Sequence, residues 1–155
     1  MRERISTAMK DALKSGDKRR LSTLRLVTAA IKDRDIAARV DDKGHATGRD
    51  KIGDTEVLAL LQKMIKQRRE SIETYRQGKR EDLADREATE IAVIEEFLPQ
   101  QMDEEETRRA VAALVTELRA SGLKDMGRVM AALKERYTGE MDFALASSAA
   151  KDLLK

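Results

Sequence analysis

The sequence predicts an all-α protein, and three observations support this prediction. Of the 155 residues, 41% are hydrophobic and 39% are charged, whereas only 3% are aromatic. Residues that favour helices, such as Ala, Leu, Glu, Lys and Arg, are abundant, and the β-branched and aromatic residues that favour strands are few. Apolar side chains recur at spacings of three and four residues, as expected for one buried face of a helix.

Two helices are predicted at the start of the chain. The first covers about residues 2–14 and ends at Gly16, because glycine readily adopts the left-handed conformation of a helix end. Asp17 is placed to cap the second, over residues 18–38, because its carboxylate can accept the free amides of the first turn. Their expected buried faces comprise Ile5, Ala8, Met9, Ala12, Leu13, Leu21, Leu24, Val27, Thr28 and Ile31.

Residues 40–54 form a predicted mobile loop, because three glycines and almost no apolar residues lie there. Asp54 is the expected cap of a third helix over residues 55–77, which stops at Gly78, and a fourth helix covers residues 81–97. The expected buried positions of these two helices are Val57, Leu61, Met64, Ile65, Arg68, Ile72, Tyr75, Ala84, Ala88, Ile91, Ile94, Phe97 and Leu98.

Pro99, the only proline, marks the predicted domain boundary. Proline disfavours helix at the preceding residue and cannot donate a backbone hydrogen bond. The sequence therefore predicts an N-terminal four-helix domain over residues 1–98 and a small three-helix domain over residues 99–155. A domain of the latter size buries only about 60% of the surface that its unfolded chain exposes, so it is marginally stable alone.

Capping residues define the three helices of the second domain. Asp103 and Glu106 have the spacing of a capping box at the start of the fifth helix, which runs to about residue 120 and ends at Ser121-Gly122. The sixth covers residues 126–137 and stops at Gly139. The seventh is capped by Asp142 and runs to the C-terminus.

Charge is distributed unevenly along the chain. Residues 1–80 contain 21 Lys and Arg against 12 Asp and Glu, whereas residues 81–155 contain 10 against 17. Two interpretations remain open. The first half presents a basic surface to an anionic or acidic partner, or the two halves attract each other within one molecule.

The sequence contains no recognisable catalytic or metal-binding constellation. Without cysteine, disulfides, iron–sulfur clusters, thiolate zinc sites and thiol catalysis are excluded. The single histidine, His45, lies in the polar loop with no second His or Cys to share a metal. Glu87, Glu90 and the acidic run 103–106 are expected to form solvated faces. We therefore predict no catalytic residue, no metal and no cofactor.

A cytoplasmic location without a membrane partner is expected. No run approaches the ~20 apolar residues that a bilayer span requires. The N-terminal segment has charge but lacks the apolar core and cleavage site of a secretory signal.

The strongest indication of binding is the basic character of the third predicted helix. Its candidate nucleic-acid contacts are Lys63, Lys66, Arg69 and Arg76, of which the last three lie roughly on one side, where they could meet successive phosphates. The alternative is that Lys66 and Arg69 pair with the glutamates four residues later on an exposed helix. With so few aromatic residues, binding of single strands through base stacking is not expected.

A second group of candidates surrounds the sixth predicted helix. Gly127 near its start permits a close approach of another backbone or a ligand, and Met130 is expected in the core. The basic candidates here are Lys124, Arg128, Lys134 and Arg136.

Three blocks of the sequence resemble the GatB/YqeY family of small bacterial proteins. They are TLRLVTAAIKDRDI (residues 23–36), the long segment from VLALLQKMIKQRRESIE to EEFLPQQMDEEE (57–106), and MGRVMAALKERYTGEMDFALAS (126–147). The resemblance implies an N-terminal helical bundle followed by a small three-helix domain. Both parts resemble the C-terminal helical region and tail of the B subunit of glutamine-dependent aminoacyl-tRNA amidotransferase. That tail is associated with tRNA recognition, and the family is classed with carbon–nitrogen ligases that use glutamine as amido-N-donor.

The resemblance carries over to only a few residues. Gly127 and Met130 match the M-G-x-V-M element of the tail, and Gly139 and Asp142 match its later Gly and Asp. The implied roles are a close helix contact, a core side chain, a helix stop and a helix cap. The ATP-dependent catalytic region of the subunit and the separate amidase have no counterpart here, so enzymatic activity of the chain alone is not expected.

Three functional hypotheses follow. The leading one is a non-catalytic, tRNA-interacting helical module that recognises the shape and phosphates of folded tRNA. The alternative is an adaptor that docks an amidotransferase or an aminoacyl-tRNA synthetase. The third is an amidotransferase component with amide-transfer activity, against which the missing catalytic groups argue.

Overall fold

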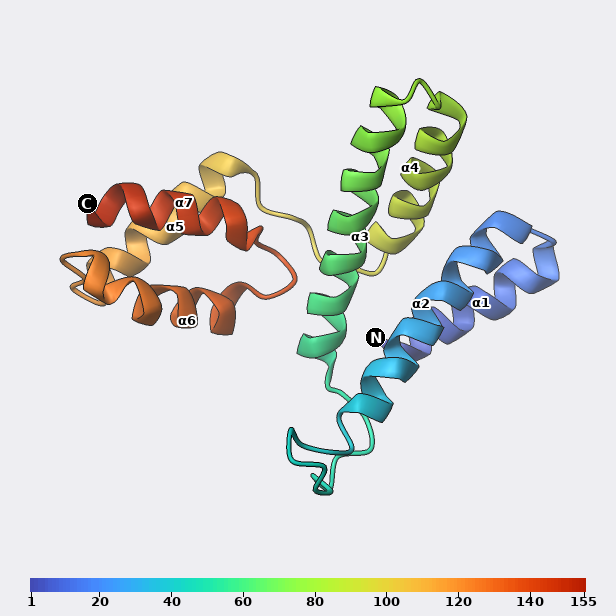
Figure 1. Ribbon diagram of the computed structural model, residues 1–155, viewed down its shortest axis with the longest axis horizontal. Helices are drawn as coiled ribbons and strands as arrows, with labels where there is room; N and C mark the ends of the chain where they lie inside the picture. Colours follow the sequence, from blue (N-terminus) through green and yellow to red (C-terminus); the bar gives the residue numbers. More distant parts are fainter. The chain divides into compact units, whose positions relative to one another are not determined.

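The computed structural model describes all 155 residues, and its regular elements are seven α-helices and one short 3₁₀ helix (Figure 1). The prediction of an all-α fold is confirmed. The chain divides into two compact units, Met1–Leu98 and Pro99–Lys155, each with its own hydrophobic core. The elements are α1 (Arg2–Ser15), α2 (Lys18–Ala37), α3 (Asp54–Gln77), α4 (Glu81–Glu95), α5 (Glu104–Glu117), η1 (Leu123–Asp125), α6 (Met126–Tyr137) and α7 (Phe143–Leu154).

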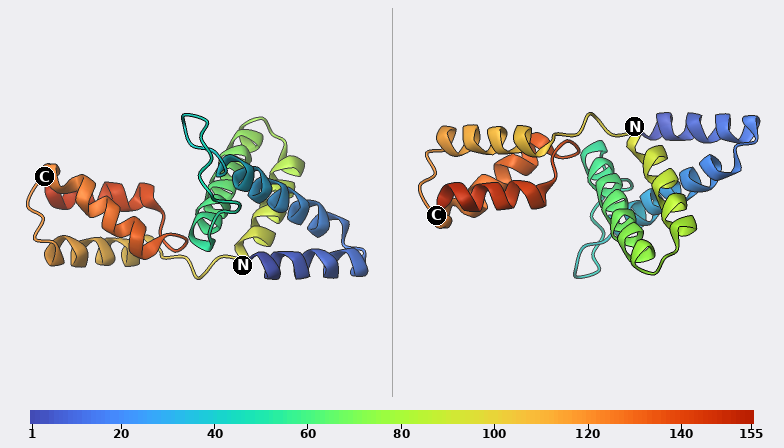
Figure 2. Two further views of the ribbon diagram at one scale, coloured as in Figure 1. Left: turned by 90° about the horizontal axis from the view of Figure 1, so that it is seen from below. Right: turned by 90° about the horizontal axis from the view of Figure 1, so that it is seen from above.

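The first unit consists of two antiparallel helical hairpins. α1 and α2 are joined by a tight turn at Gly16, and α3 and α4 by a turn after Gly78 (Figures 1 and 2). α4 also packs against α2, and α2 makes a smaller contact with α3. α2 therefore lies against all three other helices of its unit.

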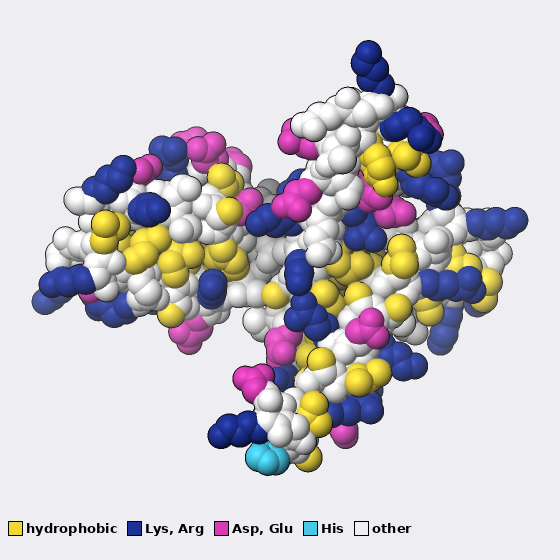
Figure 3. Space-filling view, viewed as in Figure 1, with side chains coloured by type: hydrophobic (Ala, Val, Ile, Leu, Met, Phe, Trp, Pro, Cys, Tyr) yellow, Lys and Arg dark blue, Asp and Glu magenta, His cyan; other side chains and the backbone are white.

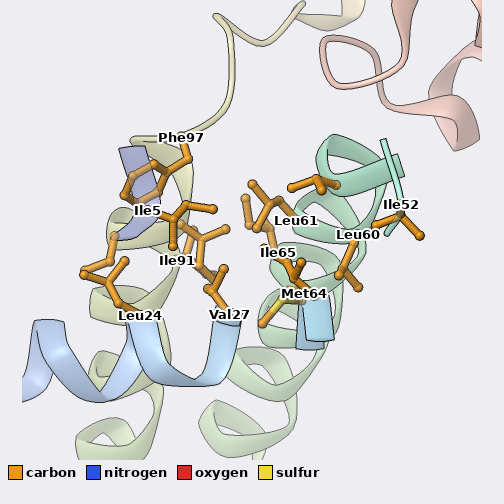
Figure 4. Packing of buried hydrophobic residues seen from close by; sticks show 14 of the residues in the cluster. Ile5, Leu24, Val27, Ile52, Leu60, Leu61, Met64, Ile65, Ile91 and Phe97 are labelled. Atoms are coloured by element: carbon orange, nitrogen blue, oxygen red, sulfur yellow. The ribbon is translucent and has the colours of Figure 1, made fainter. Parts of the chain in front are cut away.

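The core of the first unit is built from aliphatic side chains of all four helices. Leu24 and Val27 of α2, Leu61 of α3 and Ile94 of α4 have no solvent-exposed surface. Figure 4 shows that side chains from α2, α3 and α4 converge between the helices, with Phe97 at one end beside α1. Burying one such aliphatic side chain contributes roughly 1.5–3 kcal/mol, so this cluster holds the two hairpins together.

Most of the predicted helix ends are confirmed. Gly16 ends α1 in the left-handed region with φ of 74°, and the Asp17 carboxylate accepts a hydrogen bond from the amide of Arg20. Asp103 and Glu106 form the complete capping box of α5. Asp142 accepts hydrogen bonds from the first amides of α7.

The start of α3 and the ends of α4 and α5 differ from the prediction, and α4 ends at Glu95 rather than at residue 97. Gly53 rather than Asp54 occupies the cap position of α3, and Asp54 is already the first helical residue. At its other end α3 stops at Gln77, before Gly78, as predicted, but the left-handed residue of the turn is Lys79 (φ 58°), because Gly78 has φ of −84°. α5 ends at Glu117 because Arg119 turns the chain with φ of 53°, before Ser121-Gly122. A glycine near a helix end thus indicated the turn but not the residue that makes it.

Three predicted core positions are exposed instead: Leu13 (62% exposed), Thr28 and Ala88. α1 has α2 as its only helical neighbour, so the contact covers a narrower stripe than the apolar pattern suggests. The Thr28 hydroxyl donates to the carbonyl of Leu24 in its own helix. Ala88 lies outside the inner face of α4, which runs through Ala84, Ile91 and Ile94.

The segment between α2 and α3 is tied to the helices through two residues. Ile52 is buried in the core, although the sequence suggested a polar loop. The amide of Ile52 donates to the carboxylate of Asp35, which is itself buried in α2. Earlier in the loop, Val40 and Ala46 form an isolated antiparallel bridge around a turn in which Asp41 accepts the amides of Lys43 and His45.

In the second unit, α5, α6 and α7 each pack against the other two. Val111, Leu114, Val129, Leu133 and Met141 form the centre of its core, together with alanines of α7. η1, which the sequence did not predict, leads directly into α6. The amide of Met102 donates to the carbonyl of Glu140 (2.8 Å), which ties the start of the unit to the turn before α7.

None of the helices in either unit combines the length and the apolar character that crossing a membrane requires.

Candidate nucleic-acid interface

The four basic candidates of α3 are all exposed, but they differ in their partners. Arg69 forms an ion pair with Glu95 of α4 (3.2 Å), and Arg76 pairs with Glu81 (3.3 Å). Lys63 and Lys66 have no carboxylate within ion-pair distance. Neither i,i+4 pair expected as the alternative forms: Arg69 pairs with Glu95 of α4 instead of Glu73, and Lys66 has no ion pair with Glu70. The positive charge that remains uncompensated on α3 is therefore that of its lysines.

The second unit shows a similar division between its arginines and lysines. Both terminal nitrogens of Arg136 donate to Glu117 of α5 at 2.7 Å, and these hydrogen bonds lower the pKa of Glu117. Arg128 pairs with Asp125 at 3.3 Å. Lys124 and Lys134 are exposed without an ion pair. Of the four candidates here, the two lysines carry the uncompensated charge.

The residues matched to the tail motif have mostly structural roles. Gly139 ends its turn with φ of 93° and is buried, Asp142 caps α7, and Met130 is half-buried against the core. Pro99 is exposed at the first position of the second unit. The close contact expected at Gly127 is wrong. A Cβ built on Gly127 meets nothing within 4 Å, because this exposed side of α6 faces open space.

The most basic helix is α2, which the sequence analysis did not select. Five of its six cations are exposed and have no ion pair: Lys18, Arg19, Arg25, Lys32 and Arg34. The sixth, Arg20, pairs with Glu96 at 2.7 Å. Of the two acids in α2, Asp35 is buried and only Asp33 faces solvent. Comparing charge helix by helix, rather than by halves of the chain, would have revealed this surface.

Figure 3 shows Lys and Arg side chains along both α2 and α3 on the viewed face of the first unit, interspersed with hydrophobic side chains. A helix of 20 residues is about 30 Å long, so the cations of α2 span several phosphates of a nucleic-acid backbone. The charge and spacing of these side chains suit a chain of anions.

The carboxylates predicted to form a solvated face of α4 are instead half-buried against α3. The Nε of Arg68 lies 3.0 Å from a Glu90 oxygen and 4.0 Å from a Glu87 oxygen. Burial and the neighbouring charge of Glu90 raise the pKa of Glu87. Arg68 also donates to the carbonyl of Met64 in its own helix. This cluster joins α3 to α4 and is not available to an anionic ligand.

Comparison with known proteins yields one family and several relatives. The family model described as Yqey-like protein matches residues 2–154. "Altered inheritance of mitochondria protein 41, mitochondrial" of Pyrenophora tritici-repentis is 31% identical over 139 residues, which cover 86% of this chain and 71% of that protein. Its namesake in Lachancea thermotolerans is 33% identical over 115 residues, which cover 73% of this chain and 57% of that protein. The namesake in Kluyveromyces lactis is 35% identical over 116 residues, which cover the same shares of the two chains.

These relatives contradict the expected cytoplasmic location, because all three are named as mitochondrial proteins. The expectation rested on composition and on the absence of a secretory signal. Neither property distinguishes the cytoplasm from the interior of an organelle.

Proposed function

The chain belongs to the YqeY-like protein family, and we propose that it is a non-catalytic module that binds the phosphate backbone of folded tRNA. The observation that carries the proposal is the set of exposed, unpaired cations on two helices of the first unit. They are Lys18, Arg19, Arg25, Lys32, Arg34, Lys63 and Lys66. Phosphate contacts of this kind supply most of the affinity of sequence-independent nucleic-acid binding.

Folded rather than single-stranded RNA fits the side chains present. Of the four aromatic residues, Phe97 is buried and the other three are half-buried, so none presents a fully exposed ring on which an unpaired base could stack. Structured RNA is recognised mainly through shape and phosphate contacts. The choice of tRNA rests on the resemblance of the chain to the amidotransferase tail.

The test is fluorescence anisotropy of the whole chain with labelled tRNA across a salt series. We expect saturable binding that weakens steeply with salt, since each phosphate contact releases counterions. The double variant K63E/K66E should weaken binding at least tenfold and make the salt dependence shallower. No binding at low salt would refute the proposal.

The matched control is K10E/K14E, which makes the same charge change on α1. Lys10 and Lys14 are exposed and unpaired, as Lys63 and Lys66 are. Binding by this variant should stay within about threefold of the parent. If both double variants lose affinity equally, net charge rather than the surface of α3 controls binding.

An adaptor function is the second candidate, and one observation favours it. Three leucines of the second unit are exposed: Leu123 (53%), Leu145 (39%) and Leu153 (50%). An amidotransferase or an aminoacyl-tRNA synthetase docked there would cover them. The adaptor function would be supported if such an enzyme is recovered with the tagged chain after nuclease treatment and this recovery is lost in L123S/L153S. It would be contradicted if nuclease treatment abolishes the recovery.

A further inference from the structure

A polar groove lies between the first turns of α2 and the middle of α4, within the first unit. It has a volume of about 190 Å³ and is lined by Lys18, Arg19, Ser22 and Thr23 of α2 and by Arg86, Thr89 and Glu90 of α4. Pockets for whole drug-sized ligands measure about 300–1,000 Å³. This smaller groove suits one compact charged group.

The charges that line the groove are strongly unbalanced. Lys18, Arg19 and Arg86 have no carboxylate within ion-pair distance, and they come from two different helices. The one carboxylate in the lining, Glu90, lies 3.0 Å from the Nε of Arg68, which also lies 4.0 Å from Glu87, so three cations of the lining face one carboxylate that is partly compensated. Three cations that share a groove repel one another, and an anion placed among them relieves that repulsion.

One hydroxyl in the groove is also free to donate. Thr23 donates to the carbonyl of Arg19 (3.2 Å), and Thr89 donates to the carbonyl of Asp85 (3.0 Å). Ser22 makes no hydrogen bond within the protein. The groove therefore combines three cationic donors with one uncommitted hydroxyl, and the positive end of the α2 dipole adds to the same field.

The geometry points to a binding site for a phosphate monoester in this groove. A phosphate monoester carries a charge of about −1.5 to −2 at neutral pH and three acceptor oxygens, which matches three cations and a hydroxyl. A backbone phosphodiester carries a single charge and is flanked on both sides by sugar. The inference does not depend on tRNA binding, and it names a ligand chemistry that the extended cationic surface would not select.

The experiment is a ¹H–¹⁵N NMR titration of the whole chain at constant ionic strength. The probes are inorganic phosphate, a nucleoside 5′-monophosphate and, as the diester, a dinucleoside monophosphate. We expect saturable shifts confined to residues 18–23 and 86–90, with the monoester bound at least tenfold more tightly than the diester. Shifts spread over all cations without saturation, or equal affinity for both nucleotides, would overturn the inference.

Variants separate the groove from general charge. R19Q/R86Q should lower the affinity for the monophosphate at least tenfold, and S22A should lower it severalfold. R25Q/K32Q removes two exposed, unpaired cations of α2 that do not line the groove, and its affinity should stay within about twofold of the parent. Equal losses in the two double variants, with unchanged helix content, would contradict a localised site.

Two sources of the monoester are distinguished by one further comparison. A short RNA with a 5′-phosphate is titrated against the same RNA with a 5′-hydroxyl. If the 5′-phosphorylated RNA binds more tightly than both the 5′-hydroxyl RNA and the free nucleotide, the groove is assigned to an RNA terminus. Binding of the free nucleotide alone assigns it to a small phosphorylated molecule, and binding of neither rejects the site.

Discussion

Asp35 is the only charged residue buried in the protein, and it joins three segments of the first unit. Its two oxygens accept hydrogen bonds from Arg2 of α1 at 2.9 and 2.6 Å, and one of them also accepts the amide of Ile52 at 2.8 Å. Arg2 in turn donates to the carbonyl of Ile52. Removing the charge of Asp35 would leave the arginine and the loop without their shared acceptor.

We therefore expect Asp35→Asn to lower the free energy of unfolding by about 2 kcal/mol at pH 7, the scale of hydrogen bonds to a charged group. The hydrogen bonds from Arg2 hold the pKa of Asp35 below its ordinary value of 3.8. Because the carboxyl has a lower pKa in the folded than in the unfolded state, it stabilises the fold at pH values above its unfolded-state pKa. This contribution is lost as the pH falls through the folded-state pKa.

Urea unfolding of the parent and of Asp35→Asn at pH 7 and at pH 3 or below measures this effect. The difference between them should shrink at the lower pH. Asp33→Asn is the matched control, because Asp33 is exposed two residues earlier in the same helix and has no ion pair. Equal destabilisation by both variants would argue against the buried network.

Substitution by alanine is expected to change the free energy of unfolding in opposite directions at two glycines. Gly127 lies in α6 with open space around it, so Gly127→Ala should raise the free energy of unfolding by about 0.5–1 kcal/mol through helix propensity. Gly16 has φ of 74°, which costs an L-residue about 1–2 kcal/mol, so Gly16→Ala should destabilise. Thermal unfolding followed by circular dichroism tests both, and a loss of stability in Gly127→Ala would reveal a contact that this site lacks in the structure.

At the scale of whole elements, the ends of helices show how local signals operate. Asp103, Asp142 and Asp17 each accept amides of the following helix, and each precedes its helix by one residue. Asp54 is also an aspartate at the start of a helix, yet it lies inside the first turn of α3 rather than one residue before it. A carboxylate one position further along cannot accept those amides in the same way, although it still interacts favourably with the helix dipole.

Asp103→Ala should consequently lower the free energy of unfolding of its unit by about 1 kcal/mol, as loss of a cap does. Asp54→Ala should cost no more than about half as much. Amide hydrogen exchange in the first turns of α5 and α3 would measure the two effects separately. Equal acceleration in both helices would mean that Asp54 acts as a cap in solution.

At the scale of the whole molecule, the two units have separate cores. No side chain belongs to both clusters, and the boundary falls between Leu98 and Pro99. We expect Leu133→Ala, in the second core, and Leu61→Ala, in the first, to destabilise their own units by about 2–5 kcal/mol. Both leucines have no exposed surface.

Hydrogen exchange read by segment distinguishes independent from cooperative unfolding. Leu133→Ala should accelerate exchange in residues 104–154 and leave residues 54–95 unchanged, and Leu61→Ala should do the reverse. Acceleration of both units by either variant would show that they unfold together.

The sequence by itself determined the helical class, the approximate helix boundaries, most caps and the membership of the family. These features depend on residues close together in the chain: apolar spacing selects the face of a helix, and a carboxylate caps amides two or three residues away. Its periodicity also located most of the first core, including Leu24, Val27 and Leu61. Asp17, Asp103 and Asp142 show how reliable such short-range signals are.

Only the tertiary structure decided which charges remain free. Arg69 and Arg76 are compensated by glutamates that lie 26 and 5 residues away, and Glu90 lies against Arg68, 22 residues earlier in the chain. It also placed Asp35 and Ile52 in the core, exposed Leu13, and formed the groove that Lys18, Arg19 and Arg86 line. Ion pairing and burial depend on which helices become neighbours, and that arrangement results from packing among all the helices of a unit rather than from local spacing.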